Sequence, residues 1–352
     1  MKLPDPSPAR GTLAQPANRF EAVTLERDPD YDPGEEPRVR TQFLRDASAS
    51  VISSNDSPDI PFRASLNPYR GCEHGCIYCY ARPTHEYLGF SAGLDFESRI
   101  LVKERAPELL RDELAHPRWR PQPLILSGVT DPYQPVERRL ELTRRCLAVL
   151  AELRNPVAII TKNRLVARDA DLLGELARHG AAHVTLSITS LEPALRRVME
   201  PRTAPPAARL AALRELAAAG VPVGVSVSPI IPGLNDHEIP AILAAARSAG
   251  AQWAFYVLLR LPFAVKELFV AWLREHFPHR ADKVLARLHE ARGGRLNDPR
   301  FGSRMRGEGV HAEQISRLFQ TARRRAGFPA EVPGLSTAAF LRPGGVQMEL
   351  PV

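Results

Sequence analysis

Six short runs of β-branched or apolar residues, separated by helical patterns, constrain the fold of this chain most strongly. The runs lie at 65–69, 124–128, 157–161, 183–189, 221–228 and 253–259. The segments between them place apolar residues three and four positions apart, and three of these segments close on a glycine suited to a helix C-cap. Strands alternating with helices imply a parallel sheet with right-handed crossovers. Because no dinucleotide-binding glycine fingerprint is present, the sequence predicts an α/β fold with a partial (β/α)6 TIM-type barrel.

The segments on either side of this core have a different character. Residues 1–60 are rich in Pro, Asp, Arg and Ser and show no sustained periodicity, which indicates an irregular N-terminal extension. Residues 61–262 form the predicted barrel core, and residues 263–352 a basic helical extension with a tail. Helical patterns in the last segment lie at 264–277, 280–292 and 311–327.

Composition and charge limit the class of protein. Among the 352 residues, 44% are hydrophobic and 25% charged, close to the averages for soluble globular proteins. No run of roughly 18 apolar residues is present, so we expect a cytoplasmic protein without a membrane partner. Residues 1–60 carry 7 Lys+Arg against 11 Asp+Glu, a balance of −4, whereas residues 260–327 carry 15 against 7, a balance of +8. This asymmetry is compatible with a polyanionic partner such as nucleic acid, although a solvated Arg-rich helix face is the commoner explanation of a single basic run.

Three of the four cysteines lie within eight residues, as Cys72, Cys76 and Cys79, directly after the first predicted strand. Barrel enzymes assemble their active sites at this edge of the sheet. Clustered thiols in a reducing compartment indicate metal binding, but a closed zinc site needs four ligands. Three thiolates that hold a cubane cluster would leave one iron without a protein ligand.

Two other interpretations of the triplet stay open. A zinc knuckle could use His74 or His85 as its fourth ligand, and a purely structural iron–sulfur cluster would also need a fourth ligand. Cys146, the remaining cysteine, lies inside a helical pattern, where a packing role is the simpler expectation.

The cysteine spacing, with the aromatic Tyr78 directly before the last cysteine, resembles the signature of the radical S-adenosylmethionine (SAM) superfamily. The resemblance implies a [4Fe–4S] cluster on Cys72, Cys76 and Cys79, with SAM bound at the fourth iron. It also implies that an electron donor such as flavodoxin or ferredoxin reduces the cluster. Reductive cleavage of SAM would then release a 5′-deoxyadenosyl radical that abstracts a hydrogen atom from a substrate.

The resemblance continues at the ends of the later strands. Besides Tyr78, the cofactor-binding residues that it implies are Ser127, Gly128, Thr130 and Asp131 after the second strand, Ser187 and Thr189 near the end of the fourth, and Ser226, Ser228 and Ile231 around the fifth. The first group stands where the family has a Gly-Gly-Glu-like element for the SAM amino group. The glutamate is missing here, and Thr130 or Asp131 would substitute for it. The second group would face the ribose or carboxylate, and the third would face adenine. Lys162, Arg202 and Arg260 would suit a carboxylate or phosphate, or a structural ion pair.

Further segments, among them TDPYQPVE, MEPRT and SPIIPGLND, resemble the spore photoproduct lyase branch, also described as DNA-repair-photolyase-like. A nucleic-acid substrate is what this branch implies. Spore photoproduct lyase uses an additional cysteine as hydrogen donor, and the only spare thiol here is Cys146. Tyr133 and Tyr256 are other conceivable donors, but nothing in the sequence selects one, so no catalytic residue is assigned.

Two other functions compete with this one. The basic C-terminal segment would fit a metal-stabilised nucleic-acid-binding module without radical chemistry. A radical SAM enzyme that acts on a protein or a small metabolite is the other, because fold and cofactor do not determine the substrate.

Overall fold

A central sheet of seven strands organises the computed structural model, which describes residues 10–21, 39–126 and 128–342. The strand order is β10-β9-β8-β7-β6-β3-β2. Six strands are parallel, and β2 joins the edge antiparallel to β3. The strands of this sheet are β2 (Ile52–Ser54), β3 (Ala64–Leu66), β6 (Leu124–Leu126), β7 (Val157–Thr161), β8 (Ala182–Ser187), β9 (Val223–Ile230) and β10 (Trp253–Leu258). All six strands predicted from the sequence are therefore confirmed.

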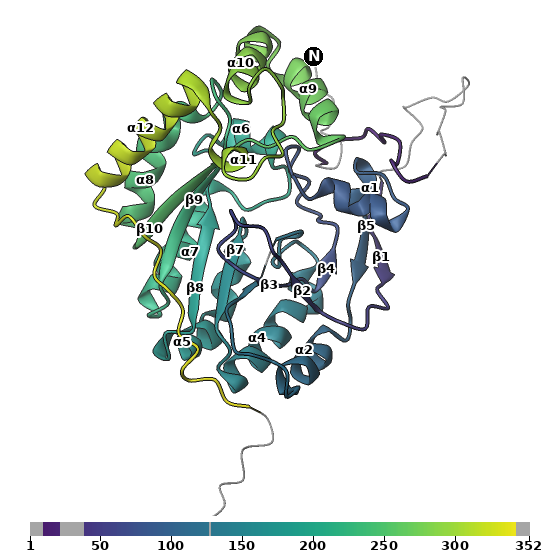
Figure 1. Ribbon diagram of the computed structural model, residues 1–352, viewed down its shortest axis with the longest axis vertical. Coiled ribbons are helices and arrows are strands. Elements are labelled where there is room, and N and C mark those ends of the chain that lie inside the picture. Colours follow the sequence, from purple (N-terminus) through teal and green to yellow (C-terminus); the bar gives the residue numbers. More distant parts are fainter. Residues whose placement is uncertain (1–9, 22–38, 127, 343–352) are drawn as a thin grey trace, which may run out of the picture.

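Helices connect the parallel strands in the alternating order expected from the sequence (Figure 1). The helices up to β10 are η2 (Arg82–Leu88), α1 (Leu94–Ser98), α2 (Ala106–Ala115), α3 (Glu137–Leu140), α4 (Leu142–Leu153), η3 (Arg164–Asp169), α5 (Ala170–Arg178), α6 (Pro193–Met199), α7 (Pro206–Ala218), η4 (Asp236–Glu238) and α8 (Ile239–Ser248). The pattern at 137–153 predicts one continuous helix, but the helix is interrupted at Glu141, whose φ is 51°. The mixed α/β class with a mainly parallel sheet is confirmed.

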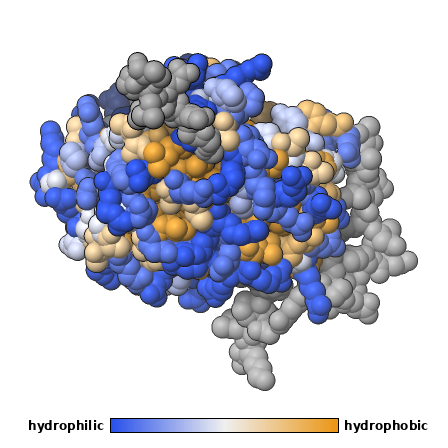
Figure 2. Space-filling view, turned by 90° about the horizontal axis from the view of Figure 1, so that it is seen from below, coloured by the Kyte–Doolittle hydropathy of each residue, from blue (hydrophilic) through white to orange (hydrophobic). Residues whose placement is uncertain are grey.

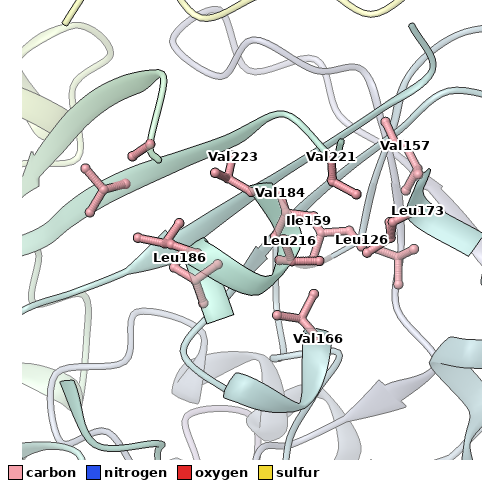
Figure 3. Close-up of a cluster of buried hydrophobic side chains, with 14 of the residues drawn as sticks. Leu126, Val157, Ile159, Val166, Leu173, Val184, Leu186, Leu216, Val221 and Val223 are labelled. Atoms are coloured by element: carbon pink, nitrogen blue, oxygen red, sulfur yellow. The ribbon is translucent and has the colours of Figure 1, made fainter. Parts of the chain in front are cut away.

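Apolar side chains on the sheet pack against these helices to form the main core. Leu126, Ile159 and Val184 lie on three neighbouring strands and face Leu173 of α5 and Leu216 of α7 (Figure 3). Burying one such side chain contributes about 1.5–3 kcal/mol. The residues of β6 are buried throughout, as expected for a parallel strand covered on both faces.

The N-terminal region is more ordered than the sequence predicts. Residues 1–60 are expected to be irregular, yet they contain β1 (Gln42–Arg45) and β2 (Ile52–Ser54). β1 pairs with β5 (Arg99–Val102), which also pairs with β4 (Tyr69–Arg70), so the three form a second small sheet. The prediction missed both strands because each has only three or four residues and mostly exposed side chains. For residues 1–9 and 22–38, the predicted irregular structure lies outside the described residues.

Helices alone follow β10 in the part of the chain described up to residue 342, as predicted. They are α9 (Val265–His276), α10 (Pro278–Ala291), α11 (Ser303–Arg306) and α12 (Gly309–Arg325). α12 packs on α8 beside β10, while α9, α10 and α11 lie at the opposite end from α2 and α5 (Figure 1). Arg292 donates hydrogen bonds to the carbonyl oxygens of Leu258 and Leu259 at 3.0 and 2.6 Å. These helices therefore cover the carboxyl end of β10, whereas the domain boundaries at 60 and 262 stay predictions.

The end of the molecule that carries α2, α4 and α5 is mostly hydrophilic, with apolar areas interspersed (Figure 2). The C-terminal tail crosses this end, where Ser336 N donates to Gly180 O at 2.9 Å and Leu341 N to Leu153 O at 2.8 Å. Within the described ranges, no helix is long and apolar enough to cross a bilayer.

Candidate functional site

The cysteine loop follows β3 and β4 at the carboxyl edge of the sheet, and its backbone is anchored to two helices. Cys72 N donates a hydrogen bond to Phe96 O in α1 at 2.9 Å, and Ile77 N donates to Met199 O in α6 at 3.1 Å. Cys72, Cys76 and Cys79 all carry free thiols. The loop therefore presents three thiols on a backbone that is fixed at both ends.

The donor chemistry of these thiols fits an iron–sulfur cluster. Cys72 and Cys76 are only 7% and 8% exposed, and Cys79 packs against the apolar groups around both. Burial raises the pKa of the Cys76 and Cys79 thiols, so cationic iron would be needed to stabilise the thiolates there. Among the described residues, no three His, Cys, Asp or Glu side chains converge as ligands of one ion would. A cubane takes each thiolate at a different iron, so this donor set suits a cluster better than a single metal.

The two histidines considered as zinc ligands have other surroundings. His74 Nδ1 lies 3.3 Å from Asp131 Oδ2, and its Nε2 lies 3.3 Å from Asn163 Nδ2. Burial opposes its charge, but Asp131 and Cys72 raise the pKa of His74 to about 9. His85 lies beside the rings of Phe90 and Phe96, and burial lowers its pKa to about 4. The structure therefore offers no support for either histidine as a fourth zinc ligand.

Tyr78, between the second and third cysteines, connects the loop to the end of β8. Its hydroxyl donates a hydrogen bond to Glu200 and lies 3.4 Å from Thr189 Oγ1. Thr189 Oγ1 donates to Glu200 Oε1 at 2.6 Å, and Arg209 forms a buried ion pair with the same carboxylate. Burial disfavours the charge of Glu200, but Arg209 and then Lys162 hold its pKa at about 2. An ionised carboxylate therefore fixes two of the residues predicted to bind the cofactor.

The end of β9 lies against the same loop. Ile231 belongs to one apolar cluster with Cys76 and Tyr78, and the hydroxyl of Ser226 donates to that of Ser228 at 2.8 Å. Thr189 Oγ1 also lies 3.1 Å from Ser228 O, which brings the ends of β8 and β9 together. The sequence pattern predicts that Asn235 or Asp236 caps the following helix. Asn235 does lie at the N-cap of η4, but its side chain accepts from Ile231 N at 2.7 Å and donates to Thr189 O at 2.8 Å instead of capping the helix.

The segment after β6 contacts the first part of the cysteine loop. Thr130 Oγ1 donates to Gly71 O at 2.7 Å, and Gly128 O accepts from the hydroxyl of Tyr80 at 2.5 Å. Asp131 accepts hydrogen bonds from Thr161 Oγ1 at 2.6 Å and from the backbone of Lys162 at 2.8 Å. Its carboxylate thus joins β7 to His74 of the loop. Ser127 lies outside the described residues.

The other predicted residues differ in how close they come to the loop. Ser187 is buried, and its carbonyl accepts a hydrogen bond from Arg209 at 2.8 Å. Arg202 forms an ion pair with Glu73 at 3.0 Å, which corresponds to the structural alternative. The ammonium of Lys162 lies 5.8 Å from the ring centroid of Tyr78, and the guanidinium of Arg260 lies 5.6 Å from that of Tyr80. Cys146 is fully buried in the main core, as its helical pattern predicts.

Glu200 and Arg209 are site residues that the sequence patterns did not reveal. Glu200 lies in the MEPRT segment, between two helices, where no periodicity indicates burial. Arg209 does leave a signal, because it falls on the buried face of α7 with Pro206, Ala212 and Leu216. A charged residue on such a face needs a buried partner. That requirement could have indicated the ion pair.

A cationic cavity of about 680 Å³ opens beside Tyr80, between the end of β10 and the C-terminal helices. Arg260, Lys266, Arg295 and Arg304 line it, together with His289 and apolar residues. Arg304 is paired with Asp59, and within the described part of the chain no acidic partner contacts the other three cations. Unpaired cations in a cavity are suited to phosphate or carboxylate groups.

Comparison with known proteins gives a family-model match and several relatives. The model described as the radical SAM superfamily matches residues 66–246. An uncharacterised protein of Mycobacterium tuberculosis is 38% identical over 221 residues, which are 62% of this chain and 65% of that protein. One from Methanocaldococcus jannaschii is 33% identical over 173 residues, 49% of this chain and 62% of that protein. The chain thus matches less than two thirds of the length of these relatives.

Solved structures with the same fold come from spore photoproduct lyase. Its complex with dinucleoside spore photoproduct aligns over 81% of this chain and 79% of that chain, with a TM-score of 0.56 and 15% sequence identity. A double mutant with bound AdoMet and dinucleoside spore photoproduct aligns over 81% and 77%, with a TM-score of 0.51 and 16% identity. Because the sequence identity is this low, the similarity to these structures shows a shared fold only.

Proposed function

Because the chain belongs to the radical SAM superfamily, we propose that it holds a [4Fe–4S] cluster on Cys72, Cys76 and Cys79 and cleaves SAM reductively. The cluster, reduced by a donor such as flavodoxin or ferredoxin, would supply the electron that yields a 5′-deoxyadenosyl radical for hydrogen abstraction. The observation that carries the proposal is the loop of three free, largely buried thiols at the carboxyl edge of a parallel sheet. We take this sheet as the partial barrel that encloses the cofactor.

The chain's own residues would bind and orient the cofactor. Tyr78 belongs to the loop, Ile231 packs in the same apolar cluster, and the Glu200 carboxylate holds Tyr78 and Thr189 by hydrogen bonds. Gly128 and Thr130 contact the loop at Tyr80 and Gly71. The ammonium of Lys162, 5.8 Å from the ring centroid of Tyr78, would suit the SAM carboxylate.

One of the residues predicted to bind the cofactor has a different role in our proposal. Asp131 is already engaged by His74, Thr161 and the backbone of Lys162, so we propose that it positions the loop after β7 rather than replacing the missing glutamate. Ser187 and Ser228 stay candidates for polar groups of the cofactor, since both lie at strand ends beside Thr189.

A matched pair of cysteine variants tests this function. Wild type, Cys76→Ala and Cys146→Ala would be reconstituted with iron and sulfide without oxygen, then given SAM and dithionite. Wild type and Cys146→Ala should form 5′-deoxyadenosine, while Cys76→Ala should form none. Product formation by Cys76→Ala equal to that of wild type would overturn the proposal.

Nucleic acid is the substrate class that a specific observation favours. The cavity beside Tyr80 has three cations without acidic partners among the described residues, and it is connected to the cysteine loop by the contact between Arg260 and Tyr80. Phosphate contacts of this kind position a strand without reading its sequence. The dinucleoside spore photoproduct bound in the lyase structures is consistent with this class. Charge reversal at Lys266 and Arg295, followed by oligonucleotide binding, tests it.

A further inference from the structure

Residues 10–21 lie along the outer side of the cysteine loop and of the helices that follow it. Gly11 N donates to Glu97 Oε2 at 2.8 Å, and Arg10 donates to Glu97 O at 2.6 Å. Ala14 O accepts from Leu94 N at 3.0 Å. Further along, Arg19 forms an ion pair of 2.8 Å with the buried Glu86. This segment, which we call the strap, is thus bound along its whole length although it forms no helix or strand.

The strap approaches the loop too closely for any side chain at the point of contact. A Cβ atom on Gly11 would lie 1.7 Å from Gly75 O, and Gly75 stands between Cys72 and Cys76. Gly75 has a φ of +67°, and a Cβ there would lie 2.6 Å from Glu97 Oε2. Gly93 likewise has room only for hydrogen, because its Cβ would lie 1.9 Å from Ala14 O. Glycine is therefore required on both sides of this contact.

A buried ion pair connects the strap to the second cysteine of the loop. Glu97 and Arg82 are both fully buried, and Arg82 Nη2 lies 2.5 Å from Glu97 Oε1. Arg82 Nε also donates to Cys76 O at 3.1 Å. The strap therefore acts on Cys76 through Glu97 and Arg82, while it covers the backbone of Gly75 directly.

We propose that the strap positions the cysteine loop and shields it from solvent, so that the cluster is retained. This inference rests on the proposed function, because it presumes that the loop holds a cluster. Without the strap, Glu97 loses the Gly11 hydrogen bond and Gly75 becomes exposed between two ligands. A loop that opens locally would release iron and admit oxygen more readily.

Two truncated chains test the proposal. Removal of residues 1–21 deletes the strap, and removal of residues 1–9 is the matched control. After anaerobic reconstitution, iron and sulfide per chain and the rate of bleaching of the cluster absorbance in air would be measured. We expect the 1–21 truncation to bleach at least about tenfold faster than the control, since it loses several hydrogen bonds to buried charged groups. Equal iron content and equal bleaching in both chains would overturn the proposal.

A point variant covers the case in which truncation destabilises the whole chain. Gly11→Val leaves the chain complete but forces the strap off Gly75, whereas Leu13→Thr changes a side chain that is 53% exposed. Hydrogen exchange at residues 72–79 should speed up in metal-free Gly11→Val and not in Leu13→Thr, with both melting temperatures near that of wild type. Unchanged exchange at residues 72–79 in Gly11→Val would contradict the proposed role of the strap. Because the metal-free protein is used, this result is independent of whether wild type binds a cluster.

Discussion

Glu200 connects the cysteine loop to the sheet by accepting hydrogen bonds from Tyr78, Thr189 and Arg209. Glu200 and Arg209 are each 1% exposed at the side chain. Removing one partner of a buried ion pair leaves an uncompensated charge, which costs far more than removing an exposed pair. The carboxylate should therefore be important both for stability and for the orientation of Tyr78.

Replacing Arg209 tests this buried charge. Arg209→Met should lower the free energy of unfolding by about 3–5 kcal/mol, because Glu200 remains buried and unpaired. Arg164→Met is the control, since Arg164 pairs with Glu215 at 2.7 Å on the surface and its replacement should cost less than about 1 kcal/mol. Urea unfolding of the metal-free proteins measures both, and equal decreases would contradict the buried role of Arg209.

The ionisation of Glu200 predicts a dependence on pH. Its pKa is lowered from 4.5 to about 2 in the folded chain, so its stabilising effect is complete above pH 4.5 and is lost as the pH falls towards 2. The difference in unfolding free energy between wild type and Glu200→Gln should therefore shrink over this range. Urea unfolding at a series of pH values measures it, and a constant difference would argue against an ionised Glu200.

At the scale of elements, the pairing of β9 with β10 depends on a glycine covered by an aromatic ring. Gly224 is the register partner of Trp253, and a Cβ on Gly224 would lie 2.1 Å from the indole. The indole N–H also donates to Thr185 Oγ1 of β8 at 3.3 Å. The ring thus lies across three strands of the sheet that holds Thr189 and Ser228.

Adding one methyl group at this position tests the packing. Gly224→Ala should destabilise the fold by roughly 1–3 kcal/mol, because the indole must move within a packed core. Gly334→Ala is a matched control, since a Cβ on Gly334 would meet no atom within 4 Å and the substitution should be nearly neutral. Thermal unfolding compares the two, and a neutral Gly224→Ala would show that the ring is free to shift.

The elements also differ in how far the sequence could predict them. The six parallel strands and most helices follow from apolar periodicity, because they bury a continuous face. The strap could not be predicted, since its contacts are made by backbone groups and glycines that leave no periodic pattern. The burial of Glu200 could not be predicted for a related reason, because its hydrogen-bond partners come from separate parts of the sequence, near β8, in α7 and in the cysteine loop. The cysteine triplet was recognisable only because its three thiols lie within one loop.

In the folded molecule, the acidic N-terminal region and the basic C-terminal region of the sequence come into contact. The acidic N-terminal region meets the basic C-terminal region in the ion pair between Asp59 and Arg304. Of the cations that line the cavity beside Tyr80, Arg260, Lys266 and Arg295 have no acidic partner among the described residues. The positive charge of the C-terminal region is therefore only partly neutralised within the chain. Positive charge remains at the cavity beside Tyr80, which we propose as the entrance for a nucleic acid.

Charge reversal tests this entrance. Lys266→Glu combined with Arg295→Glu should weaken binding of a single-stranded oligonucleotide and reduce the salt dependence of log Kd by about 0.7 for each phosphate that the protein no longer neutralises. The double variant Arg178→Glu with Arg214→Glu is the control, because it changes the net charge of the chain by the same amount, on α5 and α7. Fluorescence anisotropy over a range of salt concentrations measures both. The same weakening in both double variants would indicate a general charge effect and no specific entrance.

The proposed chemistry depends above all on a cluster that keeps one iron free of protein ligands. Mössbauer spectroscopy of the reconstituted, oxygen-free protein tests this most directly, because it distinguishes irons by their coordination. On addition of SAM, the signal of one iron of the cluster should change while the others stay as they were. A spectrum that SAM leaves unchanged, with every iron already bound by sulfur and side chains, would contradict it.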